Sequence, residues 1–359
     1  MIVTELQIRN FRNYPQAKLT LSPGINLISG DNAQGKTNLL ESLVYLSLTR
    51  SWRTNEDRLL IRNGCEFANL SCMVQNQRQV RLDAVIHSHG KTLSVNRSPV
   101  KKTSEFIGSL NTVLFSPDDL GIFLDAPRDR RRLLDQEITK VSPGYLYALR
   151  NYRSLLKDRN SLLKQIHPDE KYLDVLDQRM VQESMAIIQE RNRFFQIINS
   201  HLPKFYQTIS GSETEAEIRY LSCVRTASEE ALEKLYQDSR QKDLEFHSTS
   251  CGVHREDIVF ILNGQNVIST ASQGQKRMIL LGFKLAILKY IETISSEKAV
   301  LLLDDVLSEL DRERQKKLMD LIEQPYQCVI TGTEFPAFLR SGNPREFYIN
   351  NGTIQGGSV

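Results

Sequence analysis

The feature that most constrains this chain is an eight-residue loop with glycine at its first and sixth positions and a Lys-Thr pair at its end. The loop consists of Gly30, Asp31, Asn32, Ala33, Gln34, Gly35, Lys36 and Thr37. The apolar run at residues 24–28 predicts a short buried strand before it, and residues 38–48 carry apolar side chains at helical spacing after it. Because glycines let backbone amides converge on phosphate oxygens at a helix N-terminus, this arrangement predicts a phosphate-binding loop.

The loop predicts specific contacts to a nucleotide. Its backbone amides, together with Asn38 at the start of the helix, are expected to surround the phosphates. Lys36 is expected to reach the β- and γ-phosphates and to take part in catalysis, and the Thr37 hydroxyl is expected to ligate Mg²⁺. The alternative is a glycine-rich turn in which the Lys-Thr pair occurs by chance, and the rest of the chain weighs against it.

A second motif, at residues 299–305, is an apolar run that ends in two carboxylates. This pattern is expected for a buried parallel strand whose C-terminal end faces the phosphates. Asp304 is then the predicted Mg²⁺ carboxylate, and Asp305 is the predicted general base that orients and partly deprotonates the attacking water. For the run in isolation, the alternative is a strand that ends in a turn with solvated aspartates.

Composition excludes several classes of protein and leaves the partner open. With 359 residues, 40% of them hydrophobic and 25% charged, the chain is long enough for two folded domains or for one with a large insertion. A formal net charge of +3 is compatible with nucleic acid but too small to predict it. Five scattered cysteines favour neither a disulfide framework nor zinc. Because no apolar run has the length of a membrane span, a cytoplasmic protein is expected.

The order of predicted elements indicates an α/β fold. Alternating residues predict an antiparallel β layer beside the phosphate-binding loop, with strands over residues 2–8, 17–21, 69–74, 80–86 and 92–95. Near the C-terminus a helix is expected over 274–291, with strands over 258–262, 300–303 and 329–331. Because Lys36 and Asp304 must meet, both ends of the chain are expected to build one core, and the middle is an insertion.

The middle of the chain is predicted to be a helical arm. Apolar stripes over residues 146–163 and 173–202, the second followed by Pro203, indicate two long helices in an antiparallel hairpin. A third helix is expected near residues 228–244, where Thr226 and Glu229 have the spacing of a capping box. The expected domain segments are an N-terminal part of the ATPase head at 1–125, the arm at 126–245 and a C-terminal part of the head at 246–359.

Residues 272–277 open a predicted amphipathic helix and resemble the signature motif of the ABC ATPase superfamily. The resemblance implies that Ser272, Gly274 and Gln275 complete the nucleotide site of a second copy of the chain, where the serine hydroxyl and helix amides meet a γ-phosphate. Taken alone, the segment is better explained as an N-capped surface helix, but the three motifs in this order favour the superfamily. Residues 308–311 also match the loop that crosses between its paired subunits.

Segments along the whole chain resemble stretches typical of the RecF family of DNA repair ATPases, at residues 10–14, 113–120, 127–132, 252–257 and 271–277. The resemblance implies a head like those of structural-maintenance and Rad-type ATPases, with a short helical arm in place of their long coiled coil. It also implies ATP-dependent dimerisation, association with the nucleoid, binding to double-stranded DNA near junctions with single strands, and cooperation with RecR and RecO in loading RecA. By the same analogy, Arg12 and Asn13 are the expected adenine contacts, with a role in a surface turn as the alternative.

Departures from transporter-type ATPases predict slow hydrolysis. The loop at 115–119 has no glutamine, the strand at 329–333 ends without histidine, and Asp305 is one methylene shorter than the usual glutamate. The first two departures and the helical insertion argue against the alternative of a transporter's ATPase subunit. The short arm argues against a chromosome-structuring ATPase. A third alternative keeps ATP as a structural ligand only.

Groups of basic residues are candidates for DNA contact, because neutralising phosphates supplies most non-specific affinity. They are Arg50, Arg53 and Arg58, then Lys101 and Lys102, and then Arg128, Arg130, Arg131 and Arg132. For each group the alternative is a solvated or ion-paired surface. Arg131 and Arg132 are also suited to fixing the arm to the head, and His254 and Arg255 are suited to supporting the signature helix.

Overall fold

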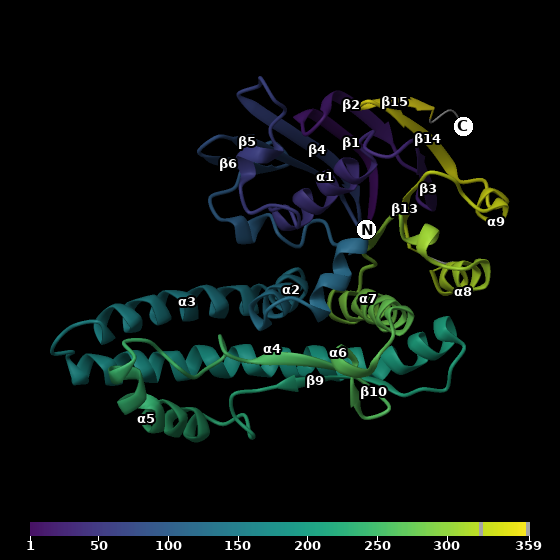
Figure 1. Cartoon of the computed structure of the whole chain (residues 1–359). Coiled ribbons are helices and arrows are strands. Elements are labelled where there is room, and N and C mark those ends of the chain that lie inside the picture. Colours follow the sequence, from purple (N-terminus) through teal and green to yellow (C-terminus); the bar gives the residue numbers. More distant parts are fainter. Residues whose placement is uncertain (323–325, 357–359) are drawn as a thin grey trace. The chain divides into compact units, whose positions relative to one another are not determined.

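The structure is a computed structural model that describes residues 1–322 and 326–356, and it divides into two compact units (Figure 1). The head unit comprises Met1–Asp119, Thr208–Gly211 and Leu280–Val359, and the arm unit comprises Leu120–Gln207 and Ser212–Ile279. The arm unit is thus inserted in sequence between parts of the head unit. The three domain segments expected from the sequence stay a prediction, because compactness alone does not define a functional domain.

A mostly parallel sheet forms one layer of the head unit. Its strand order is β15-β14-β3-β13-β12-β8, and only the β14–β15 pair is antiparallel. The bounds are β3 Ile25–Ser29, β8 Thr112–Phe115, β12 Val300–Asp304, β13 Cys328–Gly332, β14 Arg345–Asn350 and β15 Thr353–Gly356. Asp304 pairs with Thr331, and Gly332 pairs with Ser29. The predicted strands at residues 24–28, 300–303 and 329–331 therefore end at one edge of the same sheet.

An antiparallel sheet forms the second layer of the head unit, in the order β2-β1-β4-β5-β6-β7. Its strands are β1 Ile2–Phe11, β2 Tyr14–Thr20, β4 Phe67–Gln75, β5 Gln79–His87, β6 Gly90–Val95 and β7 Ser98–Pro99. The helix α1 (Lys36–Leu48) contacts β4 and β5 of this sheet and also β8, β12 and β13 of the parallel sheet. Because α1 is buried by both sheets, its apolar residues share one core with both. The predicted α/β head with a flanking antiparallel layer is confirmed.

Shorter elements complete the head unit. They are the 3₁₀ turns η1 Asp57–Leu60, η2 Thr103–Glu105 and η4 Val306–Glu309, and the helices α8 Arg312–Ile322 and α9 Ala337–Arg340. The turn η3 (Pro117–Phe123) and the helix α7 (Gln273–Ser295) each begin in one unit and end in the other. Among the residues that the structure describes, none of the helices combines the length and apolar character that a membrane crossing requires.

The arm unit is built around the predicted helical hairpin. The helices α3 (Pro143–Leu163) and α4 (Glu170–Ser210) run antiparallel, because Tyr145 bonds to Arg191 near one end and Arg159 to Asp177 near the other. The remaining elements are α2 Pro127–Thr139, α5 Glu229–Glu245, α6 Val267–Thr270 and a three-stranded antiparallel sheet of β9 Ala216–Leu221, β10 Asp257–Leu262 and β11 Gln265–Asn266. Figure 1 shows α3 along α4, the longest helix of the unit.

Two local expectations for the arm need correction. The helix α4 continues through Pro203 instead of ending before it, because its apolar stripe continues with Tyr206, which is 1% exposed. Packing of that stripe outweighs the roughly 3 kcal/mol that an internal proline costs. The cap of α5 is Ser228 rather than Thr226: the Ser228 side chain accepts a hydrogen bond of 3.1 Å from the amide of Ala231.

Candidate nucleotide-binding site

The phosphate-binding loop joins β3 to α1 through two glycines with positive φ. Gly30 has a φ of +149°, and a Cβ atom there would collide with the backbone oxygen of Ile349. Gly35 has a φ of +118°, and a Cβ atom there would lie 2.7 Å from Nδ2 of Asn13. Larger residues would be strained at both positions and would also clash. Glycine is therefore required at both positions by the positive φ and by the close approach of Ile349 and Asn13.

Lys36 is the first residue of α1, and its side chain is folded over the loop. Its ammonium donates to the backbone oxygens of Gly30 and Asp31, the second at 3.0 Å. Although the residue is only 7% exposed, these two carbonyls satisfy part of its hydrogen-bonding capacity. The positive charge therefore lies beside the loop, where a phosphate would need it.

The end of β12 faces the start of α1. The Thr37 hydroxyl donates to Oδ1 of Asp304 at 3.0 Å, and the Thr331 hydroxyl donates to the same oxygen at 2.8 Å. Burial raises the pKa of Asp304, although both hydroxyls act in the opposite direction. Asp305 follows in the left-handed conformation, with its amide donating to the Thr331 hydroxyl at 3.1 Å. The side chains of Thr37, Asp304 and Thr331 and the backbone amide of Asp305 thus meet at one edge of the parallel sheet.

Asn13 braces the loop from the antiparallel sheet. Its Nδ2 donates to the backbone oxygen of Gln34 at 2.8 Å, and its Oδ1 accepts from Asn38 at 2.9 Å. Arg12 donates to both carboxylate oxygens of Glu41, at 2.7 and 2.8 Å, and to the backbone oxygen of Leu59. These contacts place both residues close to the loop helix. Their role as adenine contacts stays a prediction.

Sequence reasoning missed several residues that support the site. Glu41 on α1 is fully buried, and it accepts hydrogen bonds from Arg12 and Ser51. The amide of Asn351, in the turn between β14 and β15, donates to Oε1 of Gln34 at 2.6 Å. Residues 34 and 351 lie at opposite ends of the chain, so no local pattern connects them. Glu41 could have been suspected as a charged residue within an apolar helical run.

The loop after β8, which has no glutamine of the kind found in transporter-type ATPases, is held in place by Asp119. Asp119 accepts a hydrogen bond of 2.7 Å from the amide of Ser116 through Oδ2. Its Oδ1 accepts from the Lys284 ammonium at 2.7 Å, and the Lys284 side chain is 4% exposed. Because this ion pair is nearly buried, it fixes the loop to α7. Lys284 was not singled out from the sequence.

The signature segment forms the N-terminus of α7. The Ser272 hydroxyl accepts from the amide of Gln275 at 3.2 Å, and the Gln275 side chain accepts from the amide of Ser272 at 2.9 Å. This reciprocal pair is a capping box. Ser272, Gly274 and Gln275 are all exposed, and a Cβ atom on Gly274 would have only the Ser272 hydroxyl within 4 Å, at 3.9 Å. The segment therefore presents an ordered, uncovered helix end in the arm unit.

Several of the predicted basic residues are engaged in internal pairs. Arg53 donates to Asn38 at 2.8 Å and also lies 3.5 Å from the Glu41 carboxylate, and Arg58 pairs with Glu56. The Arg130 guanidinium pairs with Asp257 at 2.7 Å, and Arg131 donates to the backbone oxygen of Glu256. Lys101, Lys102 and Arg128 are exposed. Contact of any of these groups with DNA stays a prediction.

Known proteins match this chain over nearly its whole length. Residues 2–344 match the family model described as RecF/RecN/SMC N terminal domain. The chain is 37% identical to the DNA replication and repair protein RecF of Lactobacillus johnsonii, over 99% of each chain. It is 38% identical to the protein of the same description from Lachnoclostridium phytofermentans, over 99% of this chain and all of the other.

Solved structures of related proteins also resemble the chain over nearly its whole length. The chain superposes with a TM-score of 0.91 and 33% identity on a structure described as the recombination mediator protein RecF with ATP in the RecFOR pathway, covering 99% of this chain and 98% of the other. The Smc head domain of Pyrococcus furiosus, 16% identical with a TM-score of 0.57 over 99% of this chain and 95% of the other, shares the fold. The chain therefore belongs to the RecF family of DNA replication and repair proteins, within the RecF/RecN/SMC group.

Proposed function

We propose that this chain is an ATP-hydrolysing, DNA-binding protein that dimerises on ATP and acts in recombinational gap repair and replication restart. One observation carries the proposal: the hydroxyl of Thr37, the last residue of the loop that begins at Gly30, lies 3.0 Å from Oδ1 of Asp304. A phosphate-binding loop and a buried carboxylate at the end of another strand of the same parallel sheet are the two halves of an ATPase site.

Each residue of the site has a task in this proposal. The amides of residues 30–38 and the Lys36 ammonium hold the phosphate oxygens of ATP and orient the γ-phosphate for attack. Thr37 and Asp304 hold Mg²⁺, which when bound offsets the negative charge of the phosphates. Asp305 orients the attacking water and accepts a proton from it. Because its side chain is short, we expect hydrolysis to be slow.

The residues present suit magnesium. Carboxylate and hydroxyl oxygens are the donors that this cation prefers. Burial raises the pKa of Asp304, and a divalent cation beside it would favour the charged carboxylate and lower the pKa again. The carboxylate of Asp304 and the hydroxyl of Thr37 already share a hydrogen bond, so both oxygens lie within reach of one ion.

The signature helix supplies the link between ATP and assembly. Ser272, Gly274 and Gln275 are exposed and ordered by their own capping box, so they are available to a γ-phosphate held by Lys36 of a second copy. A nucleotide that binds only the dimeric state stabilises that state. Any DNA surface shared by two copies would then gain affinity from ATP.

The partners follow from the relatives. A protein of 33% identity is described as a recombination mediator in the RecFOR pathway. We extend this to the present chain, as a protein that binds double-stranded DNA near junctions with single strands and works with RecR and RecO to load RecA. Hydrolysis of ATP would then time the release of the dimer from DNA.

The decisive experiment is chromatography with light scattering, with and without ATP and Mg²⁺, on the natural chain and on Ser272→Arg. The natural chain is expected to dimerise only with nucleotide, and Ser272→Arg is expected to bind ATP but remain monomeric. A matched variant, Asp305→Asn, should bind ATP and dimerise yet lose hydrolysis by about 100-fold or more, since general-base catalysis is typically worth that much. A Ser272→Arg protein that dimerises normally on ATP would rule out the shared site.

A further inference from the structure

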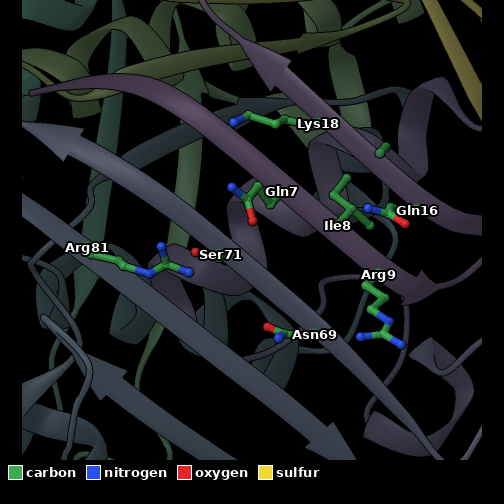
Figure 2. Close-up of a pocket in the computed structure, with 9 residues that line it drawn as sticks. Gln7, Ile8, Arg9, Gln16, Lys18, Asn69, Ser71 and Arg81 are labelled. Atoms are coloured by element: carbon green, nitrogen blue, oxygen red, sulfur yellow. The ribbon is translucent and has the colours of Figure 1, made fainter.

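The antiparallel sheet of the head unit carries a hollow that the nucleotide site does not use. It is a cavity of about 390 Å³, formed by side chains of the four adjacent strands β2, β1, β4 and β5 (Figure 2). Its polar lining includes Gln7, Arg9, Lys18, Asn69, Ser71 and Arg81. These residues alternate along their strands with the core residues that face α1, so they lie on the opposite face of the sheet.

Strand register brings the polar side chains together. Gln7 is paired with Lys18 on one side and with Ser71 on the other, and Arg9 is paired with Asn69. Arg81 comes from β5, the fourth strand of the row. With strands about 4.8 Å apart, three spacings make this polar row about 14 Å wide. A row of this width is long enough to contact more than one phosphate of a nucleic-acid strand, because the phosphates of one strand follow one another every ~3.4 Å along the helix axis.

The face carries an excess of positive charge. Lys18 pairs with Glu5 at 2.8 Å and Arg81 pairs with Asp83 at 3.0 Å, so two of its three cations are balanced by carboxylates. Arg9 is exposed, and its guanidinium lies 6.0 Å from the centre of the Phe67 ring. Within the part of the chain that the structure describes, Arg9 has no carboxylate partner. The Lys18 side chain is 60% exposed, so its remaining donors are also accessible.

We propose that this face binds the phosphate backbone of DNA, an inference that rests on the proposed DNA-binding function and assigns its contact surface. Arginine, lysine, glutamine, asparagine and serine are the side chains that contact phosphate and sugar oxygens in protein–DNA complexes. A protein partner would need apolar anchors at the centre of the patch. The apolar lining residues, Ile8 and Ala17, are 1% and 7% exposed and belong to the core. The contact is therefore electrostatic and independent of base sequence.

The test measures duplex DNA affinity as a function of salt for Arg9→Gln and for the double variant Arg9→Gln, Arg81→Gln. Each lost phosphate contact should reduce the slope of log affinity against log salt by about one and weaken binding about tenfold at 0.1 M salt. Arg9→Lys keeps the charge and should retain most of the affinity. Arg340→Gln is the matched control, because Arg340 is an exposed arginine of the head unit whose Nε lies 3.3 Å from Glu346. It should leave the slope unchanged.

ATP binding and ATP-dependent dimerisation are measured on the same samples. Both should be unchanged in the Arg9 variants, which shows that the protein is folded and that its nucleotide site is intact. An unchanged salt slope in the double variant, with DNA binding by the natural chain, would overturn this surface while the proposed function stands. Absence of DNA binding by the natural chain would instead reject the proposed function. Equal competition by poly-glutamate at matched charge would assign the face to acidic protein segments and overturn the inference.

Discussion

The Thr37 hydroxyl donates a hydrogen bond of 3.0 Å to Oδ1 of Asp304, although 267 residues separate them in the chain. Thr331 donates to the same oxygen from the neighbouring strand β13. Three short segments, from the start of α1 and the ends of β12 and β13, thus converge on one carboxylate. Because each segment belongs to a buried element, the geometry is set by the core rather than by a flexible loop.

This contact predicts a magnesium-specific defect for Thr37→Val. The variant removes the hydroxyl but keeps a branched side chain of similar size, so loop and helix should be retained. ATP affinity in the presence of Mg²⁺ should fall roughly 10- to 100-fold, the usual effect of losing a group that supports a metal site. Affinity measured in EDTA should not change. Thr37→Ser restores the hydroxyl and should bind like the natural chain; equal losses with and without Mg²⁺ would contradict a metal role.

Gly30 and Gly24 provide a matched pair for the loop. Gly30→Ala places a Cβ atom against the backbone oxygen of Ile349 at a φ of +149°, so we expect a strain of about 1–3 kcal/mol and loss of ATP binding. Gly24 lies just before β3, and a Cβ atom added there would have no neighbour within 4 Å. Gly24→Ala should therefore leave ATP binding unchanged. Calorimetric titration with ATP distinguishes the two, and normal binding by Gly30→Ala would refute the steric argument.

A buried network of charged residues predicts where a substitution in the arm unit lowers stability most. Arg191 is 1% exposed and donates to Asp135 at 2.8 Å, to Glu256 and to the backbone oxygen of Val253. Arg191→Met leaves both carboxylates without their buried cation and should lower the free energy of unfolding by about 3–5 kcal/mol. Arg153 pairs with the same Asp135, but its side chain is 60% exposed.

Arg153→Met is therefore the control for the Arg191 variant, with an expected cost below about 1 kcal/mol. Denaturant unfolding of both variants, followed by circular dichroism, measures the difference. Equal costs would mean that burial does not decide the strength of these pairs.

The sequence was sufficient for the parts of the fold that repeat a simple pattern. Alternation identified β4, β5 and β6, and helical periodicity identified α1, α3 and most of α4. The sequence also predicted that Lys36 and Asp304 lie at the same edge of one sheet, because their two motifs imply a shared ligand. The contacts of Glu41 with Arg12, of Lys284 with Asp119 and of Asn351 with Gln34 did not follow, because only the folded chain brings these residues together.

Expectations failed where tertiary packing overrode a local rule. Pro203 predicted the end of a helix, but buried residues on both sides of it keep α4 continuous. For the basic groups around Arg53 and Arg130 the sequence left both a DNA contact and an ion-paired surface open, and the fold gives each of these two arginines a carboxylate partner. The cationic hollow around Arg9 was not anticipated, because its residues come from four strands and form no run in the sequence.

His254 is held in one tautomer by two neighbours in the arm unit. Its Nε2 lies 3.2 Å from the backbone oxygen of Thr249, which can only accept, so this nitrogen carries the proton. Nδ1 then accepts from the Tyr152 hydroxyl at 2.7 Å. The residue thus links the segment before β10 to α3. Burial lowers the pKa of His254 from its ordinary value of 6.5 to about 4, and the nearby cation of Arg255 adds to this effect.

This shift predicts a loss of stability in acid. Between pH 6.5 and about 4 the unfolded chain binds a proton at His254 that the folded chain does not, so stability falls as pH falls through this window. Relative to pH 8, the contribution lost at pH 5 is about 2 kcal/mol.

Urea unfolding at both pH values should show this difference for the natural chain and for the variant His167→Gln, which replaces an exposed histidine of the arm. His254→Gln should be less stable at pH 8 but should lose about 2 kcal/mol less on acidification, because glutamine does not titrate. The same acid loss in His254→Gln would assign the effect to other groups.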